Sequence, residues 1–204
     1  MSQDLVLKDV RFTWLDVLEE NKKYGNYRVE CLLEPDSTED KNLQSAIREA
    51  AVEKWGEAKA NNFIKSAAAN RKVCRKTEML PNKKTGEVAD FYVGKVVLTA
   101  SRRADRDGPP RVYCARLDDP TKLKPVSKDS TFDGLVKPVG GNFGDVIVNI
   151  WAFEFDGAPQ INCTLDTVAF RREGEPISTR TKLSEAGVAA ALGAAIETDD
   201  PFNE

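Results

Sequence analysis

Two long alternating segments joined by a turn constrain the fold of this chain most strongly. They read "DVIVNIWAFEF" (residues 145–155) and "QINCTLDTVAF" (residues 160–170), and "DGAP" separates them. Alternation of apolar and polar residues on both sides of a Gly-containing turn predicts a β-hairpin. The first segment is apolar on both faces, as in a central strand: Val146, Val148, Ile150 and Ala152 share one face, and Trp151, Phe153 and Phe155 share the other. We expect Trp151 and Phe153 to pack under helices.

Four further segments alternate in the same way, at residues 5–17, 24–34, 91–103 and 111–117. Residues 37–70 have apolar residues at helical spacing and a break near Gly56, so this insertion predicts one or two helices. About six short strands with one helical insertion indicate a mainly β, α+β protein, either a small, partly open barrel or a sandwich. The variant that we expect is a partly open, OB-fold-like β-barrel over residues 1–183, with the helices over one end or one outer face. Residues 184–204 should form a flexible acidic tail.

The residue types exclude several classes of active site. The chain has no histidine, which removes His-based triads and Cys/His zinc sites. The four cysteines are widely spaced and fit reduced, buried thiols. No phosphate-binding loop motif occurs. We therefore expect a protein that is not an enzyme and that needs no metal or cofactor. The absence of a membrane-length apolar run and of a signal-peptide pattern favours the cytoplasm.

Charge is distributed unevenly along the chain. The formal net charge is −3, yet residues 65–128 hold sixteen Lys or Arg against seven Asp or Glu, a balance of +9 that leaves −12 for the remainder. A basic region within an acidic protein predicts a surface that binds a polyanion.

Aromatic residues are interleaved with these cations in the strand-like segments. One face of segment 91–103 would carry Phe91, Lys95 and Arg103, and Arg111 and Tyr113 would share a face of the next strand. Cations neutralise phosphates and aromatic rings stack on unpaired bases, so this combination is typical of single-stranded DNA binding. The candidate DNA-binding residues are Lys72, Arg75, Lys76, Phe91, Lys95, Arg102, Arg103, Arg106, Arg111 and Tyr113. For Trp151 and Phe153, a stacking platform is the alternative to a place under the helices.

The runs "FYVGKVVLTASRRADRDGPPRVY" and "FGDVIVNIWAFEFDGAPQINCTLDTVAFRREGEPI", followed by an acidic tail, carry a family resemblance. From about Leu5 to Ile177 the chain resembles bacteriophage single-stranded DNA-binding proteins of the OB-fold replication type. The resemblance implies a protein that coats single strands without sequence preference during phage replication or recombination in the infected host cell.

The C-terminal segment "AIETDDPFNE" is acidic and contains one aromatic residue. The resemblance implies that Asp199, Asp200, Pro201 and Phe202 contact replication proteins such as a polymerase, helicase or primase. Here Asn203 and Glu204 follow the aromatic residue, whereas related tails finish at or beside it. Independently of the resemblance, an anionic segment can compete with DNA for a cationic groove.

Two other functions compete with DNA binding. A structural or adaptor protein of a phage replication complex or virion would use the basic face for an acidic protein partner. A magnesium-dependent nuclease would use the acid pairs Asp105 with Asp107 and Asp118 with Asp119, although turn formation explains these pairs more simply. The sequence leaves the oligomeric state open, a homodimer included.

Overall fold

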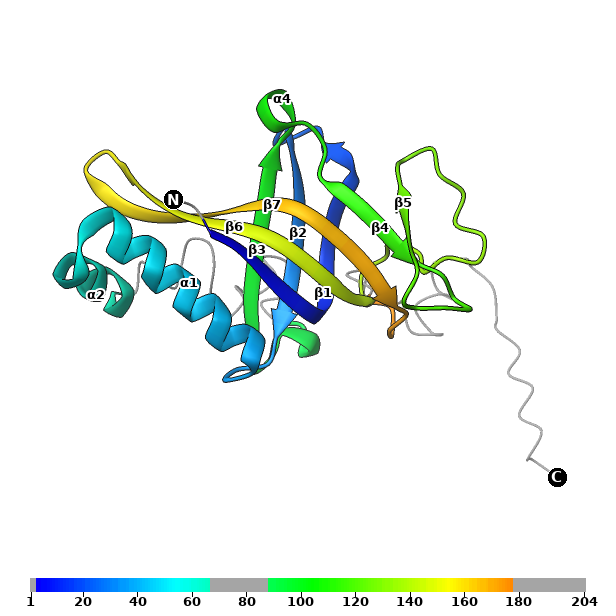
Figure 1. Cartoon of the computed structure of the whole chain (residues 1–204), viewed down its shortest axis with the longest axis horizontal. Helices are drawn as coiled ribbons and strands as arrows, with labels where there is room; N and C mark the ends of the chain where they lie inside the picture. Colours follow the sequence, from blue (N-terminus) through cyan, green and yellow to red (C-terminus); the bar gives the residue numbers. More distant parts are fainter. Residues whose placement is uncertain (1–2, 67–87, 178–204) are drawn as a thin grey trace, which may run out of the picture.

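The chain forms one seven-stranded sheet that curls and partly closes on itself, with two helices packed beside it (Figure 1). The computed structural model describes residues 3–66 and 88–177. Its elements are β1 (Gln3–Asn21), β2 (Asn26–Leu33), α1 (Thr38–Trp55), α2 (Glu57–Lys65), the 3-10 helix η1 (Asp90–Tyr92), β3 (Val96–Arg103), α4 (Ala104–Asp107), β4 (Arg111–Ala115), β5 (Leu123–Val126), β6 (Phe143–Phe155) and β7 (Ala158–Arg172).

The strand order confirms the predicted fold class. Neighbouring strands follow the order β3-β2-β1-β6-β7-β4-β5, and a parallel pairing of Ser101 with Thr164 brings β3 against β7. Five strands (β1, β2, β3, β6 and β7) therefore form an OB-fold-like, partly closed barrel. β4 pairs in parallel with β7 beyond the point where β3 contacts it, from Arg111 opposite Thr167 onward, and β5 extends this edge.

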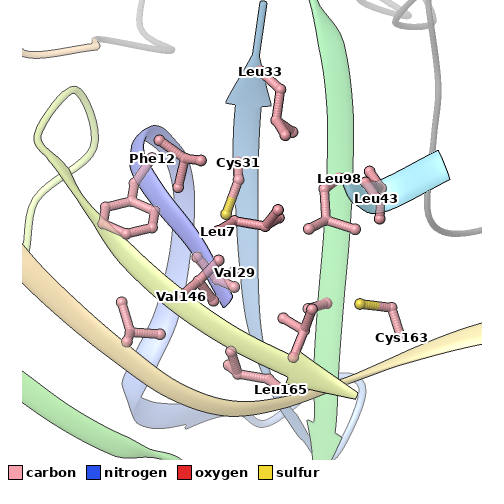
Figure 2. Packing of buried hydrophobic residues seen from close by; sticks show 14 of the residues in the cluster. Leu7, Phe12, Val29, Cys31, Leu33, Leu43, Leu98, Val146, Cys163 and Leu165 are labelled. Carbon is pink, nitrogen blue, oxygen red and sulfur yellow. The ribbon is translucent and has the colours of Figure 1, made fainter. Parts of the chain in front are cut away.

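The core lies inside the curled sheet, where alternate residues of each strand meet (Figure 2). Val29 and Cys31 of β2 lie opposite Ala100 and Leu98 of β3, and all four side chains are fully buried. The Phe12 and Phe170 rings contact edge to face with centroids 5.0 Å apart. Further buried side chains from β1, β6, β7 and α1 complete this cluster: Leu7, Val146, Leu165 and Leu43.

The cysteine prediction agrees with this core. Cys31, Cys114 and Cys163 are all buried. Burial raises the pKa of the Cys114 thiol to about 12, which leaves it protonated and unreactive at neutral pH. Cys74 lies outside the described residues.

The predicted helical insertion is confirmed over Thr38–Lys65. Ser37 caps α1, because its side chain accepts a hydrogen bond from the Asp40 amide at 3.1 Å. The helix ends at Gly56, whose φ of 77° is outside the range that helical residues adopt. α1 then packs against the neighbouring strands β1 and β6.

The hairpin between β6 and β7 forms as the sequence predicts. Phe155 pairs with Ala158 across a two-residue turn of Asp156 and Gly157. Both turn residues have positive φ, at 48° and 73°, which is the conformation that Asp-Gly turns favour.

One predicted strand is wrong at its start. Residues 91–95 are not extended into the sheet, because η1 occupies residues 90–92 and Gly94 has a φ of 69°. β3 begins only at Val96. The helix α4 and the strand β5 are further differences: no helix was predicted at residues 104–107 and no strand at residues 123–126.

Candidate nucleic-acid interface

The two apolar faces of β6 have different surroundings. On one face, Ile150 is fully buried and Glu154 forms an ion pair with Lys59 of α2 at 2.6 Å, so this face is the one turned toward the helices. Because side chains alternate along a strand, Trp151 and Phe153 lie on the opposite face. The prediction that these two aromatic residues pack under the helices is therefore wrong. They are half-buried on the outside of the sheet.

A row of side chains begins at Trp151 and crosses the strands β7, β3 and β2 on the outer face of the sheet. The Trp151 Nε1–H donates a hydrogen bond to Thr164 Oγ1 of β7 at 3.0 Å. Thr164 pairs with Ser101 of β3, and Ser101 pairs with Arg28 of β2. Directly paired residues project from the same face of a sheet, so these four side chains form one row, which we call the outer row. In OB folds the outer surface of the second and third strands, here β2 and β3, is a site of oligonucleotide binding.

A cluster of exposed cations lies at the end of β2 and β3, two residues beyond the outer row. Arg103 of β3 pairs with Asn26 of β2, about 7 Å along the strands from the pairing of Ser101 with Arg28. The adjoining β1–β2 turn and α4 are linked by a hydrogen bond from the Ala104 amide to the Gly25 carbonyl oxygen at 3.1 Å. We call the four exposed cations of these segments the basic rim: Lys22, Lys23, Arg103 and Arg106.

The β1–β2 turn also contributes an aromatic ring. Tyr24 is 63% exposed, and the Lys23 ammonium lies over its ring at 5.1 Å from the centroid. Lys22, Lys23 and Tyr24 are not among the residues predicted from the sequence, because they lie outside the basic region at 65–128. The feature of the sequence that could have identified them is a tyrosine that directly follows two lysines in the turn between two strands.

Two of the predicted arginines have structural partners beside the outer row. Arg102 donates to the backbone carbonyl oxygens of Asp107 at 2.7 Å and of Gly108 at 3.1 Å, and its guanidinium lies 3.6 Å from Asp166. It therefore ties the loop after α4 to β7. Arg111 forms an ion pair with the other carboxylate oxygen of Asp166. Burial raises the pKa of Asp166, but hydrogen bonds from Arg111 and Thr167 outweigh it and hold this pKa below its usual range.

The predicted residues of β4, of segment 91–95 and of the segments outside the described ranges have three different outcomes. Arg111 and Tyr113 share the outer face of β4, as predicted, with Tyr113 half-buried. Phe91 and Lys95 do not lie on the strand face predicted for them: Phe91 is in η1 with its ring 4.3 Å from that of Tyr92, and Lys95 pairs with Glu34. The remaining predicted residues lie outside the described part of the chain: Lys72, Arg75, Lys76, Asp199, Asp200, Pro201 and Phe202.

A buried carboxylate lies on the outer side of β2, next to the outer row. Glu30 is 2% exposed and its Oε1 accepts hydrogen bonds from Tyr92 Oη at 2.6 Å and Thr13 Oγ1 at 2.8 Å. Its Oε2 lies 3.1 Å from the Arg28 guanidinium. Glu30 thus holds η1 against β2 and fixes the orientation of Arg28.

The acid pairs considered for magnesium have protein partners instead. Arg103 donates two hydrogen bonds to Asp105, at 2.9 and 2.7 Å, and lowers the pKa of that carboxyl. Arg116 does the same for Asp118, at 2.8 and 2.9 Å. Within residues 3–66 and 88–177, no three Cys, Asp or Glu side chains converge as a metal site would require. No helix in this part of the chain is long and apolar enough to span a membrane.

A comparison with protein families identifies the chain. Residues 3–199 match the model of a family described as the ssDNA-binding protein of Enterobacter phage Enc34. The chain belongs to this family. The predicted resemblance to phage single-stranded DNA-binding proteins is therefore confirmed. A search of curated proteins finds no match.

Solved structures show that members of the Enc34 ssDNA-binding protein family share this fold. The single-stranded DNA-binding protein from bacteriophage Enc34 in complex with ssDNA aligns with a TM-score of 0.60 and 16% identity, covering 86% of this chain and 89% of that one. A second structure, of the single-stranded DNA-binding protein from bacteriophage Enc34, aligns with a TM-score of 0.58 and 16% identity over 90% and 89% of the two chains. Its C-terminal truncation aligns at 0.57 and 18% identity over 85% and 86%.

Proposed function

We propose that this chain binds single-stranded DNA without sequence preference and coats it during phage DNA replication or recombination. The observation that carries the proposal is the family match over residues 3–199. The outer row and the basic rim supply the chemistry. Exposed cations at the rim attract phosphates, and the β2–β3 surface between the rim and Trp151 offers hydroxyl and guanidinium groups to a bound strand.

A competition experiment tests this function. A labelled dT oligonucleotide bound to the protein is challenged with unlabelled dT, unlabelled mixed-sequence single strand and unlabelled duplex. The two single strands should displace the label equally, and the duplex should displace it only at much higher concentration. Equal displacement by duplex and single strand contradicts the proposal.

Single substitutions at Arg103 and Tyr113 should weaken binding and leave the fold intact. Removing one phosphate contact lowers affinity for single strands about fivefold at 0.1 M salt, and removing a stacking ring costs about tenfold. Arg116 is a matched control, because it is exposed like Arg103 and pairs with Asp118 as Arg103 pairs with Asp105. Fluorescence anisotropy with labelled dT measures all three alanine variants. If Arg103→Ala and Tyr113→Ala both bind like Arg116→Ala, the interface lies elsewhere.

We further propose that the acidic C-terminal tail has two roles, contacting replication proteins through Asp199, Asp200, Pro201 and Phe202 and competing with DNA for the cationic surface. The support is the charge contrast between residues 184–204, which contain five acids and no Lys or Arg, and the basic rim. We also propose that the protein acts in the cytoplasm of the infected host cell.

Deleting residues 197–204 should raise the affinity for dT, most strongly at low salt. Four of the five acidic charges of the tail are removed, so the gain should be severalfold at 20 mM salt and small at 0.3 M, where the Debye length is short. Replacing the same four acids by their amides while keeping Phe202 should give the same gain. Affinity that falls or stays constant on deletion contradicts competition between the tail and DNA.

A further inference from the structure

The edge of β1 that faces away from β2 has no strand partner after Phe12. On this side β6 pairs with β1 only as far as Arg11 with Phe143. Residues 141–142 then bond to the Phe12 carbonyl oxygen at 2.7 Å and to its amide at 2.9 Å. Within the described ranges, no strand pairs with residues 14–20 on this side. An unpaired strand edge is a place where a further extended segment can add to a sheet.

A groove of about 600 Å³ lies beside residues 17–20 of this free edge. β4 and the segment that follows β5 form its opposite wall, and Figure 1 shows β4 and β5 beside this part of β1. Its volume is in the range of about 300–1,000 Å³ that ligand sites have. The apolar side chains that line it include Val17, Leu18, Tyr27, Pro110, Val112 and Val126.

The groove also carries acids that have no ion-pair partner in the described part of the chain. These are Glu19, Glu20 and Asp129, and all three are exposed. Three carboxylates repel phosphates, so the groove does not suit a DNA strand. Glu19 and Glu20 are on β1 itself, so a segment added to the free edge lies directly beside them. The charges therefore favour an extended segment that contains cations.

Ile177, the last residue that the structure describes, lies next to the start of the free edge. Its amide donates to the Gly140 carbonyl oxygen at 3.1 Å. Gly140 is so close to β1 that a Cβ atom on it would lie 2.7 Å from the Thr13 carbonyl oxygen. The Arg11 guanidinium also donates to the Glu175 carbonyl oxygen at 2.9 Å. The backbone is therefore fixed at β1 immediately before the segment that follows Ile177.

The next six residues, "STRTKL" at 178–183, have the composition of a cationic edge strand. The two threonines favour extended structure because they are β-branched. In an extended segment Arg180 and Lys182 share one face, and Leu183 lies on the other. Arg180 and Lys182 are also the only cations in residues 178–204. This segment therefore carries the charge and the apolar side chain that the groove favours.

We propose that residues 178–183 bind this groove in the same molecule, as a strand parallel to β1 along its free edge. Six extended residues span about 20 Å, and the seven steps from Thr13 to Glu20 span about 23 Å, so the lengths agree. The occupant belongs to the same chain because Ile177 is held beside the groove. A segment tethered this closely has a high effective concentration, which the same segment of a second copy lacks.

The bound segment gives the acidic tail a defined starting point, and this consequence rests on the competition between tail and DNA proposed above. Lys22 of the basic rim is also part of the groove lining. A strand that runs from Thr13 toward Glu20 therefore ends near the basic rim. Residues 184–204 then begin beside the cations with which their acids compete for DNA.

Hydrogen–deuterium exchange of the full chain tests the docking without DNA. The amides of residues 179–183 should exchange roughly tenfold or more slowly than in a free peptide of the same sequence, because strand hydrogen bonds protect them. This protection should not depend on protein concentration. Exchange at the rate of the free peptide overturns the proposal. Protection that rises with concentration also overturns it, because the segment then binds a second copy.

A charge-swap cycle tests whether this groove is the site. Arg180→Glu/Lys182→Glu and Glu19→Lys/Glu20→Lys should each lower the protection of residues 179–183 about fivefold, because like charges then meet. The variant that combines all four substitutions should recover most of the protection. Structural damage would not be repaired by further substitutions. If the combined variant is no better protected than either pair, the segment does not lie beside these acids.

A control variant reverses two charges outside the groove. Lys41 and Lys54 are exposed on α1. Lys41→Glu/Lys54→Glu changes the net charge as much as Arg180→Glu/Lys182→Glu does, and it should leave the protection of the segment unchanged. An equal loss of protection in the two variants means that net charge and not contact with the groove holds the segment, which overturns the proposal.

The consequence for DNA binding has a separate measurement. Leu183→Ser removes the apolar contact without a change of charge, so it should release the segment and raise affinity for dT about threefold at 20 mM salt. Unchanged affinity, with protection lost, overturns the link between the groove and the tail's competition with DNA. Failure of the unchanged protein to bind dT contradicts the proposed function instead, and hydrogen exchange still decides the docking.

Discussion

Replacing all four cations of the basic rim by alanine is expected to lower affinity for single-stranded DNA roughly 100-fold or more at 0.1 M salt. Each phosphate contact contributes about −0.7 to the slope of log affinity against log salt for single strands. Loss of four contacts should therefore make this slope shallower by about 3. Lys22, Lys23, Arg103 and Arg106 are exposed, so their removal should leave the stability of the fold nearly unchanged.

The control variant removes the same number of positive charges from the helices instead of from the basic rim. Lys41, Arg48, Lys54 and Lys65 are exposed on α1 and α2. Replacing these four by alanine alters the net charge equally, and it should lower affinity only through the weak long-range field. Isothermal titrations at four salt concentrations compare the slopes. Equal slopes for the rim and helix variants mean that the rim does not contact phosphates.

Glu30→Ala is expected to lower the free energy of unfolding by about 2–4 kcal/mol. The substitution leaves the buried Thr13 hydroxyl and the half-buried Tyr92 hydroxyl without their acceptor and opens a cavity beneath η1. It also frees the Arg28 guanidinium from the carboxylate that orients it. Urea denaturation followed by circular dichroism measures the change.

Two further variants test whether the hydrogen-bond network of Glu30 causes this loss of stability. Glu30→Gln keeps an acceptor for Thr13 and Tyr92, so it should lose less stability than Glu30→Ala. Glu34→Ala removes an exposed glutamate from the same segment, one that pairs with Lys95 on the surface, and should cost less than about 1 kcal/mol. Equal losses for Glu30→Ala and Glu34→Ala contradict a stabilising role for the network.

Periodicity was enough to predict the barrel and its hairpin. The alternation in residues 145–170 and the Asp-Gly turn determine the pairing of β6 with β7, because a shift by one residue would expose the whole Val146 to Ala152 face. The helical spacing of apolar residues over 37–70 and the break near Gly56 likewise predict α1 and α2. These are local signals, and each is confirmed by the structure.

Periodicity could not predict which face of β6 packs against the helices. Both faces of β6 are apolar, so the alternation alone does not say which one the helices cover; that depends on how α1 packs, and it leaves Trp151 outside. The start of β3 was misplaced because Phe91 to Val93 have strand-like residue types, whereas Gly94 with its positive φ ends the extended pattern. The basic rim joins two segments that are far apart in sequence, so counting charge along the chain found Arg103 and Arg106 and missed Lys22 and Lys23.

Binding of single-stranded DNA by this chain is best measured by a fluorescence titration with dT at 50 and 200 mM salt, repeated with a duplex of equal length. We expect tight binding of the single strand, with affinity that falls about 50-fold between the two salt concentrations if four phosphates are contacted. The duplex should bind much more weakly at both. Binding of duplex and single strand with equal affinity, or single-strand affinity that does not change with salt, would contradict this expectation.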